Sequence, residues 1–259
     1  MKLKRFIISF LLLILIFACT INVSAENKIY NWYCKRTSDH SQPPLPNEFE
    51  FINNYEGYYI DNNDSEKVIY LTFDAGYENG NIAKTLDVLK NNNVTSAFFI
   101  LSNLIKSNPE LVKRMAEDGH LVCNHTATHK DMSKVKNFEN FKEELEKLET
   151  DYRFTTGREV AKYFRPPEGR FTEETLNFAN QLGYKTIFWS FAYADWDNNK
   201  QMSCDAAKKK IMDNIHNGAV ILLHPTSETN AQILNDIIIE LKQMGYRFAS
   251  LDELTKIGR

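Results

Sequence analysis

The stretch Val68-Ile-Tyr-Leu-Thr-Phe-Asp-Ala-Gly76 indicates how this chain folds. Residues 68–73 are apolar except for Thr72 and rich in aromatic and β-branched side chains, which predicts a buried strand. The strand ends in the carboxylate of Asp74, which a glycine turn follows. A helical pattern then covers residues 81–91. Strand, short polar turn and helix in this order predict one βα unit of a parallel sheet.

The same alternation continues to the end of the chain. Further strands are predicted at residues 96–101, 121–123, 163–164, 185–190, 219–223 and 247–251. Further helices are predicted at residues 109–118, 137–153, 172–183, 206–216 and 230–244. Because the gaps between these elements are short, we expect a single α/β domain at residues 66–259.

The first 65 residues differ in pattern. Residues 1–25 predict a secretory signal peptide, since basic residues precede an apolar run from 6 to 18 and a Val23-Ser24-Ala25 cleavage site. The run is short for a membrane span, and an uncleaved anchor is the alternative. Residues 26–65 are polar and aromatic with three nearby prolines, which indicates an N-terminal arm lying over the domain. We therefore expect an exported protein with no integral membrane span after cleavage.

Composition narrows the class of protein. The 259-residue chain is 43% hydrophobic and 25% charged, as is typical of a globular protein. Without the signal peptide it carries 28 basic and 34 acidic residues and no basic cluster, so we expect no nucleic-acid partner. Cys34, Cys123 and Cys204 are widely spaced, and we interpret them as free, with one disulfide as the alternative.

Chemically active side chains recur just after predicted strands. They are Asp74, His125, His129, Arg165, Asp195 and His224. In a parallel barrel the carboxyl ends of the strands share one face, and active sites lie on that face. Agreement among several independent positions predicts a common site more strongly than any one residue does.

His125 and His129 are four residues apart, so a helical turn or a tight loop can bring both imidazoles onto one ion. Zinc binds such nitrogen ligands, with three protein ligands and a water in typical catalytic sites, and a third ligand is not evident here. Two unrelated surface histidines are the alternative. We therefore predict that the protein binds a divalent metal, and we expect this metal to be zinc.

Other residues suit acid–base chemistry near that ion. Asp74 can serve as a ligand or as a general base toward water, although taken alone a turn or helix cap is the commoner role. His224 suits a general acid, with a buried core histidine as the alternative. Arg165, followed by two prolines, is rigidly placed to meet a carboxylate.

The pair Asp195-Trp196 combines a carboxylate that can orient a histidine with an aromatic wall for a sugar face or an acetyl methyl group. Trp189, by contrast, is interpreted as a core residue. The roles assigned to Asp195-Trp196 and to Trp189 do not depend on whether a metal is bound.

Together these residues resemble the polysaccharide deacetylase family (the nodulation-deacetylase homology, or carbohydrate esterase 4, family), whose five motifs all have counterparts between residues 66 and 255. The counterparts are Thr72-Phe-Asp-Ala-Gly76, His125-Thr-Ala-Thr-His129, Arg165-Pro-Pro-Glu-Gly169, Ala192-Tyr-Ala-Asp-Trp196 and Leu222-Leu-His224. The resemblance implies a distorted (β/α) barrel of about seven units. It also implies hydrolysis of N-acetyl groups on a glycan.

The resemblance assigns a role to each residue. Asp74 is the expected base that activates water, oriented by Arg165. The two histidines of the second motif are the expected metal ligands. His224 is the expected acid that protonates the leaving amine, tuned by Asp195. The expected substrate contacts are Tyr77, Glu78, Asn79, Pro167, Trp196 and Leu222.

Two positions depart from the family pattern. The second aspartate of the first motif, normally a metal ligand, is Ala75, and the first aspartate of the fourth motif is Ala192. Two histidines alone bind a metal weakly unless water, substrate or another side chain completes the site. A subgroup similar to the delta-lactam-forming muramic acid deacetylases of spore cortex often lacks this aspartate and carries the extended Asp-x-Gly-Tyr-Glu-Asn-Gly found at residues 74–80.

These patterns predict an exported, metal-dependent deacetylase acting on N-acetylmuramic acid of a peptidoglycan strand, in the cell wall or spore envelope. The alternatives are an N-acetylglucosamine deacetylase, an acetyl-ester hydrolase, or a glycan-binding protein that has lost catalysis. Ala75 motivates the last of these.

Overall fold

The computed structural model describes residues 28–37 and 39–256. The predicted signal peptide lies outside the described residues. Within these ranges, none of the helices combines the length and the apolar character needed to cross a membrane.

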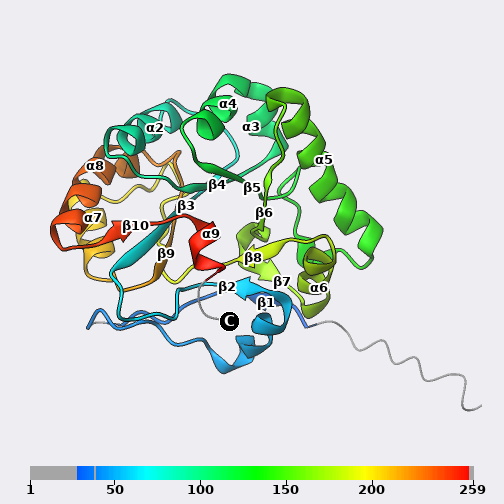
Figure 1. Cartoon of the computed structure of the whole chain (residues 1–259), viewed down its shortest axis with the longest axis horizontal. Helices are drawn as coiled ribbons and strands as arrows, with labels where there is room; N and C mark the ends of the chain where they lie inside the picture. Colours follow the sequence, from blue (N-terminus) through cyan, green and yellow to red (C-terminus); the bar gives the residue numbers. More distant parts are fainter. Residues whose placement is uncertain (1–27, 38, 257–259) are drawn as a thin grey trace, which may run out of the picture.

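An eight-stranded sheet curls around a central axis, and helices ring its outside (Figure 1). Strand-to-helix units follow one another along the described chain: β3 (Val68–Ala75) with α2 (Ile82–Asn91), β4 (Ala97–Ile100) with α3 (Ser102–Ser107) and α4 (Pro109–Glu117), β5 (Leu121–Asn124) with α5 (Phe138–Thr156), β6 (Ala161–Phe164) with α6 (Glu173–Gln181), β8 (Lys185–Ile187) with α7 (Cys204–Met212), β9 (Ala219–Leu223) with α8 (Glu228–Gln243), and β10 (Arg247–Phe248) with α9 (Leu251–Leu254). The predicted distorted (β/α) barrel of about seven units is confirmed.

The distortion lies at one seam. β3 pairs in parallel with β9, β10 and β4, and the parallel order continues through β5, β6 and β8. On the far side of β9, the link toward the segment after β8 is an isolated bridge between Phe191 and Ile221. Ser190 and Phe191 donate their backbone N–H groups to the carbonyl of Val220. For this reason β8 ends at Ile187 instead of continuing to residue 190 as predicted.

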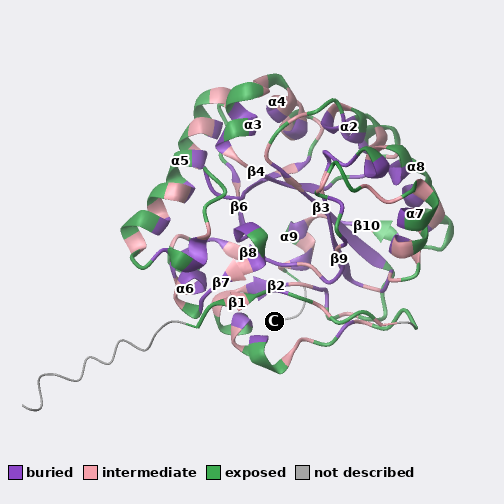
Figure 2. Ribbon diagram, turned by 180° about the vertical axis from the view of Figure 1, so that it is seen from behind, coloured by how far each residue is buried: buried purple, intermediate pink, exposed green. Residues whose placement is uncertain are grey.

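The alternation of side chains along β3 explains where the polar residues go. Successive side chains of a strand point to opposite faces. The residues that pack under the surrounding helices are Ile69, Leu71 and Phe73. The residues that fill the barrel interior are Val68 and Tyr70. Thr72 and Asp74 continue this inward row, so the strand delivers its carboxylate to the barrel axis. Figure 2 shows β3 and its neighbours as almost entirely buried.

The N-terminal arm is more deeply integrated than a segment lying over the domain. It consists of β1 (Tyr30–Asn31), η1 (Asn47–Tyr55) and β2 (Gly57–Tyr58). β2 pairs in parallel with β8 and so belongs to the barrel sheet, while β1 pairs antiparallel with β7 (Arg170–Phe171). Trp32 stacks between Phe49 and Phe188, with ring centroids 5.0 and 4.2 Å away. Two-residue strands carry no readable periodicity, which is why the sequence did not predict them.

The end of the chain also differs from the predicted strand at 247–251. Only Arg247–Phe248 is a strand, and the short helix α9 begins at Leu251. Leu251 and Leu254 lie on one helical face and pack into the barrel interior. The same buried cluster holds Val68 and Ala97, the first residues of β3 and β4, so α9 closes the end of the barrel opposite the carboxyl ends of the strands. Figure 1 shows α9 at the centre of the ring of strands. Cys34, Cys123 and Cys204 are free, as interpreted from the sequence.

If the arm is part of the fold, Trp32→Ala should be strongly destabilising. We expect a loss of about 3–5 kcal/mol in the free energy of unfolding, because truncation leaves a cavity among stacked rings. Chemical denaturation of the mature protein measures it. Phe154→Ala is the control, since that ring is 93% exposed and should change stability by less than about 0.5 kcal/mol. Equal midpoints for the two variants would show that the arm contributes no stability.

Candidate active site

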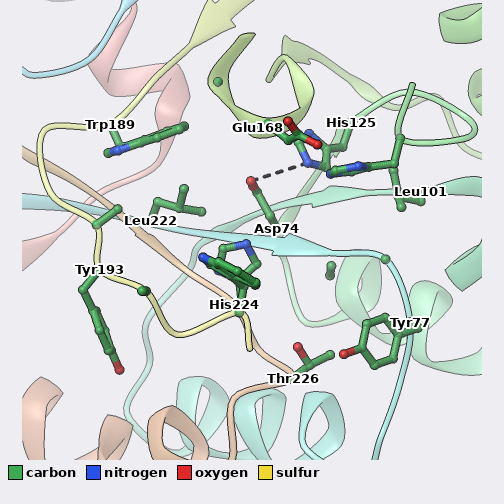
Figure 3. A pocket seen from close by; sticks show the side chains of 17 residues that line it. Asp74, Tyr77, Leu101, His125, Glu168, Trp189, Tyr193, Leu222, His224 and Thr226 are labelled. Atoms are coloured by element: carbon green, nitrogen blue, oxygen red, sulfur yellow. Dashed lines mark ion pairs between the residues drawn. The ribbon is translucent and has the colours of Figure 1, made fainter. Parts of the chain in front are cut away.

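A cavity of about 790 Å³ opens at the carboxyl end of the barrel strands. β3 contributes Asp74, the loop after β5 contributes His125 and His129, and the end of β9 contributes His224. Figure 3 shows Asp74 between the imidazoles of His125 and His224. Four of the six polar residues predicted to share one face therefore line this cavity, and the other two, Arg165 and Asp195, contact Asp74 and His224 from behind.

Asp74 is held by a fully buried guanidinium. Arg165 Nη1 donates to Asp74 Oδ1 at 2.7 Å. Arg165 Nε donates to the carbonyl of Ile187 at 3.0 Å, and Nη2 donates to the Thr72 hydroxyl at 2.9 Å and to the carbonyl of Phe188 at 3.3 Å. A buried charge is stable only when it is paired and hydrogen-bonded in this way.

The protonation of Asp74 follows from this contact. Burial by itself raises the pKa of Asp74, but the charge of Arg165, helped by His125 and His224, outweighs burial and lowers that pKa. The side chain is 10% exposed, toward the cavity. Asp74 is thus an ionised carboxylate that faces a substrate-sized space and can accept a proton from water.

His125 and His129 lie in a loop, and their ring centroids are 5.1 Å apart. His125 Nδ1 lies 2.8 Å from the carbonyl oxygen of Arg165 and so carries the proton. Its unprotonated Nε2 faces the cavity, 3.5 Å from Asp74 Oδ2. Burial lowers the pKa of His125 to about 4 despite the nearby Asp74 charge. The ring is neutral at pH 7, which is the form that binds metals.

The loop between the two histidines is strained and braced. Thr126 has φ 73° and His129 has φ 59°, and a positive φ is uncommon for a β-branched residue. His129 N donates to Thr126 Oγ1 at 2.9 Å. Glu144 of α5 accepts hydrogen bonds from the backbone N–H and the hydroxyl of Thr128, at 3.2 and 3.0 Å. These contacts fix the separation of the two imidazoles before any ligand arrives.

His224 is held on the opposite side of the cavity. Its Nδ1 lies 2.7 Å from Asp195 Oδ1, and its backbone N–H donates to Asp195 Oδ2 at 2.8 Å. Because Nδ1–H donates to Asp195, the ring is oriented with Nε2 toward the cavity. Burial lowers the pKa of His224, but the hydrogen bond to Asp195 and the charge of that carboxylate outweigh burial and raise the pKa above its ordinary value. His224 can therefore carry a second proton near neutral pH and deliver it into the cavity.

Comparisons with known proteins place the chain in one family. Residues 61–187 match the polysaccharide deacetylase family model. Over 232 residues the chain is 40% identical to the peptidoglycan-N-acetylmuramic acid deacetylase PdaA of Bacillus subtilis, a match that covers 89% of this chain and 88% of PdaA.

The chain belongs to the polysaccharide deacetylase family. The solved structure of B. subtilis PdaA, a family 4 carbohydrate esterase, matches with a TM-score of 0.85 at 40% identity, covering 88% of this chain and 97% of that one. A peptidoglycan-N-acetylglucosamine deacetylase of Bacillus cereus is 33% identical over 195 residues, 74% of this chain and 69% of that protein.

Membership of this family implies a bound divalent metal. The described residues supply only part of a binding site for such an ion. Ala75 is buried in the core beneath the helices and offers no ligand atom. Across 28–37 and 39–256, no trio of histidine, cysteine, aspartate or glutamate side chains is arranged to hold an ion. The imidazole nitrogens of His125 and His129 nevertheless suit zinc. The donor set therefore fits a metal with two protein ligands, leaving its other positions to water and substrate.

The predicted substrate contacts fall into two groups in this deacetylase. Tyr77, Trp196 and Leu222 line the cavity, and Trp196 is 61% exposed at its mouth. Glu78 accepts hydrogen bonds from the backbone N–H groups of Gly80 and Ile82, so it caps α2.

Two further predicted contacts also lie away from the cavity wall. Asn79 Nδ2 donates to the carbonyl of Thr226 at 2.8 Å and ties two loops together. Pro167 is buried in η3 (Pro167–Gly169). Contact between substrate and Glu78, Asn79 or Pro167 stays a prediction, and these hydrogen bonds give Glu78 and Asn79 structural roles.

Sequence reasoning missed several cavity residues of this deacetylase. They are Leu101, Glu168, Gly169, Trp189, Tyr193, Ala194 and Thr226. Trp189 packs on the core as interpreted, but it also forms one wall of the cavity (Figure 3). The signal available was proximity to the motifs, since Trp189 lies three residues before the fourth motif and Tyr193 lies within it.

Glu144→Ala should weaken zinc binding by about 10- to 100-fold, the usual effect of removing a residue that orients metal ligands. Competition with a chromophoric chelator measures the dissociation constant without reference to activity. Glu146→Ala, on the same helix and 54% exposed, is the matched control. Equal zinc affinity in both variants would show that the brace on Thr128 does not organise the two histidines.

Asp195→Asn should lower the pKa of His224, because the hydrogen bond and the charge of Asp195 are the main causes that raise it. NMR titration of the histidine side chains of the metal-free protein measures this value. Asp197→Asn is the control, since its carboxylate does not contact the ring. An unchanged His224 titration in Asp195→Asn would contradict the assigned coupling.

Proposed function

We propose that this chain removes the acetyl group from N-acetylmuramic acid residues of peptidoglycan, as an exported enzyme of the cell wall or spore envelope. The observation that carries the proposal is the pairing across one cavity. An ionised Asp74, held by Arg165, faces a His224 whose proton is held by Asp195. The 40% identity to PdaA supports the muramic substrate.

The geometry supports a hydrolysis with one base and one acid. Asp74 accepts a proton from a water molecule as that water attacks the acetyl carbonyl carbon. The new C–O bond forms while Arg165 stays paired with the carboxylate and keeps it aimed at the cavity. A divalent ion held by His125 and His129 would polarise the carbonyl and stabilise the negative charge that develops on its oxygen.

Departure of the amine completes the reaction. His224 Nε2 donates its proton to the glycan nitrogen as the C–N bond breaks, because an amide nitrogen leaves as a neutral amine and not as an anion. Asp195 stabilises the imidazolium until the transfer. Acetate and a free amino sugar are the products. On a muramic residue the freed amine stands near the lactyl carboxyl, with which a delta-lactam can form.

The cavity wall supports a carbohydrate substrate. Tyr77 and Trp196 are 46% and 61% exposed at the mouth, and Trp189 forms an inner wall. Aromatic faces give a sugar ring apolar contact area without fixing its hydroxyl groups. The family's acetyl-ester activity and the glucosamine specificity of the B. cereus relative are the competing assignments.

Acetate release by the mature protein tests the proposal. The two substrates are peptidoglycan glycan strands stripped of stem peptides and N-acetylglucosamine oligomers, each with and without chelator and added zinc. We expect release from the muramic substrate only, lost with chelator and restored by zinc. Release from the glucosamine oligomers alone would overturn the muramic assignment, and release from neither would favour the glycan-binding alternative.

Asp74→Asn should lower kcat by about 10²–10⁴-fold, because the amide keeps the shape of the side chain but cannot accept the proton from water. Asp87→Asn is the control, since Asp87 is exposed and pairs with Arg114 on the surface. Steady-state kinetics on the muramic substrate measures both. Unchanged turnover in Asp74→Asn would show that the base is another group.

A further inference from the structure

Asn230 lies outside all five sequence motifs, yet it belongs to the acid side of the site. It sits in the first turn of α8 and is 3% exposed. Ser227, the N-cap of this helix, accepts a hydrogen bond from the backbone N–H of Asn230 at 3.1 Å. The helix start therefore places the Asn230 side chain before any side-chain contact is considered.

Both ends of the Asn230 amide are used. Nδ2 donates to Asp195 Oδ2 at 2.6 Å, and the hydroxyl of Tyr193 donates to Oδ1. Nδ2 also lies 3.4 Å from the carbonyl of His224. The opposite orientation of the amide would place its oxygen against the carboxylate, so the contacts fix which end carries the NH₂ group.

The carboxylate of Asp195 accepts three hydrogen bonds, two from His224 and one from Asn230. Oδ1 meets the ring Nδ1, while Oδ2 receives the backbone N–H of His224 and the Asn230 amide. The carboxylate is 1% exposed, so water does not replace a lost donor easily. Without Asn230, one carboxylate oxygen loses a side-chain donor, and the plane of the carboxylate is less firmly set.

We propose that Asn230 is a positioning residue for deacetylation. Through Asp195 it holds the His224 ring so that Nε2 meets the nitrogen of the leaving amine, and Tyr193 of the cavity wall anchors the amide from the other side. This inference rests on the proposed function, since it assigns Asn230 a part in proton delivery by His224.

The chemistry of the leaving group separates this role from a structural one. An amide nitrogen needs the proton of His224 before the C–N bond breaks. 4-Nitrophenolate leaves as an anion and needs no proton. A misplaced acid therefore slows hydrolysis of the N-acetyl substrate but not that of 4-nitrophenyl acetate, whereas general damage to the site slows both.

The experiment compares Asn230→Ala, His224→Ala and Asn235→Ala on both substrates, using the metal-loaded mature protein. Asn235 is on the same helix and bonds to Asn92 outside the site, so it is the matched control. For Asn230→Ala we expect kcat on the N-acetyl substrate to fall about 10- to 100-fold, as for loss of one hydrogen bond to a charged group, with little change in KM. The aryl ester rate should change less than about threefold, and Asn235→Ala should resemble the unaltered protein.

An equal loss on both substrates, or no loss on the N-acetyl substrate, would overturn the inference. Asn230→Ser, which keeps a small polar side chain without the reach of the amide, replaces Asn230→Ala if that variant does not fold. The NMR signal of the His224 Nδ1 proton provides a readout without substrate, and it should shift in the Asn230 variants and not in Asn235→Ala.

The two proposals fail in distinguishable ways. If His224→Ala slows both substrates equally, the acid role in the proposed function is wrong, and the Nδ1 signal alone decides whether Asn230 positions the ring. If His224→Ala is selective for the N-acetyl substrate and Asn230→Ala is not, the proposed function stands and the role of Asn230 is wrong. An unshifted Nδ1 signal in the Asn230 variants contradicts the positioning contact in either case.

Discussion

The ion pair between Arg165 and Asp74 is the constraint on which the rest of the site depends. A fully buried guanidinium is tolerated because the barrel surrounds it with acceptors from β3 and β8 and with the Phe99 ring, 4.1 Å from its centre. The backbone of Arg165 also serves the metal side, since its carbonyl accepts the His125 proton. One residue thereby sets the charge of the base and the tautomer of a neighbouring imidazole.

On each side of the cavity, a buried charged group shifts the pKa of a neighbouring group of opposite charge. On one side a buried cation keeps a carboxylate ionised, and on the other a buried carboxylate keeps an imidazole ready to be protonated. Each pKa shift favours the protonation state that the role of the group requires, which is ionised for Asp74 and protonated for His224. Asp74 lies on β3 and Arg165 directly follows β6, whereas His224 directly follows β9 and Asp195 lies in the loop after β8.

Much of this arrangement could be predicted from local sequence. The apolar run ending in Asp74 and the alternation of strands and helices predicted the barrel, because those signals lie within one or two elements. Contacts between distant segments could not be predicted in this way. The pairing of Gly57–Tyr58 with β8, the burial of Leu251 and the bond from Asn230 to Asp195 each join segments whose relation exists only in the folded chain.

Motif membership was also an incomplete guide to position. Glu78 and Asn79 belong to the extended first motif, yet their side chains satisfy backbone groups of nearby turns. A short polar side chain after a strand can serve either a substrate or its own backbone, and residue type alone does not distinguish them. Trp189 lies outside the motifs, yet its indole forms a wall of the cavity as well as packing on the core.

The packing of α9 inside the barrel has a consequence for how a polymer meets this protein. Leu251 and Leu254 fill the barrel interior at the end opposite the cavity, so side chains close that end among the described residues. On the proposed function, a glycan strand would lie across the mouth of the cavity and place a single acetyl group inside it. Such a geometry has no need of a free chain end, so residues in the middle of a long strand are as accessible as those at its termini.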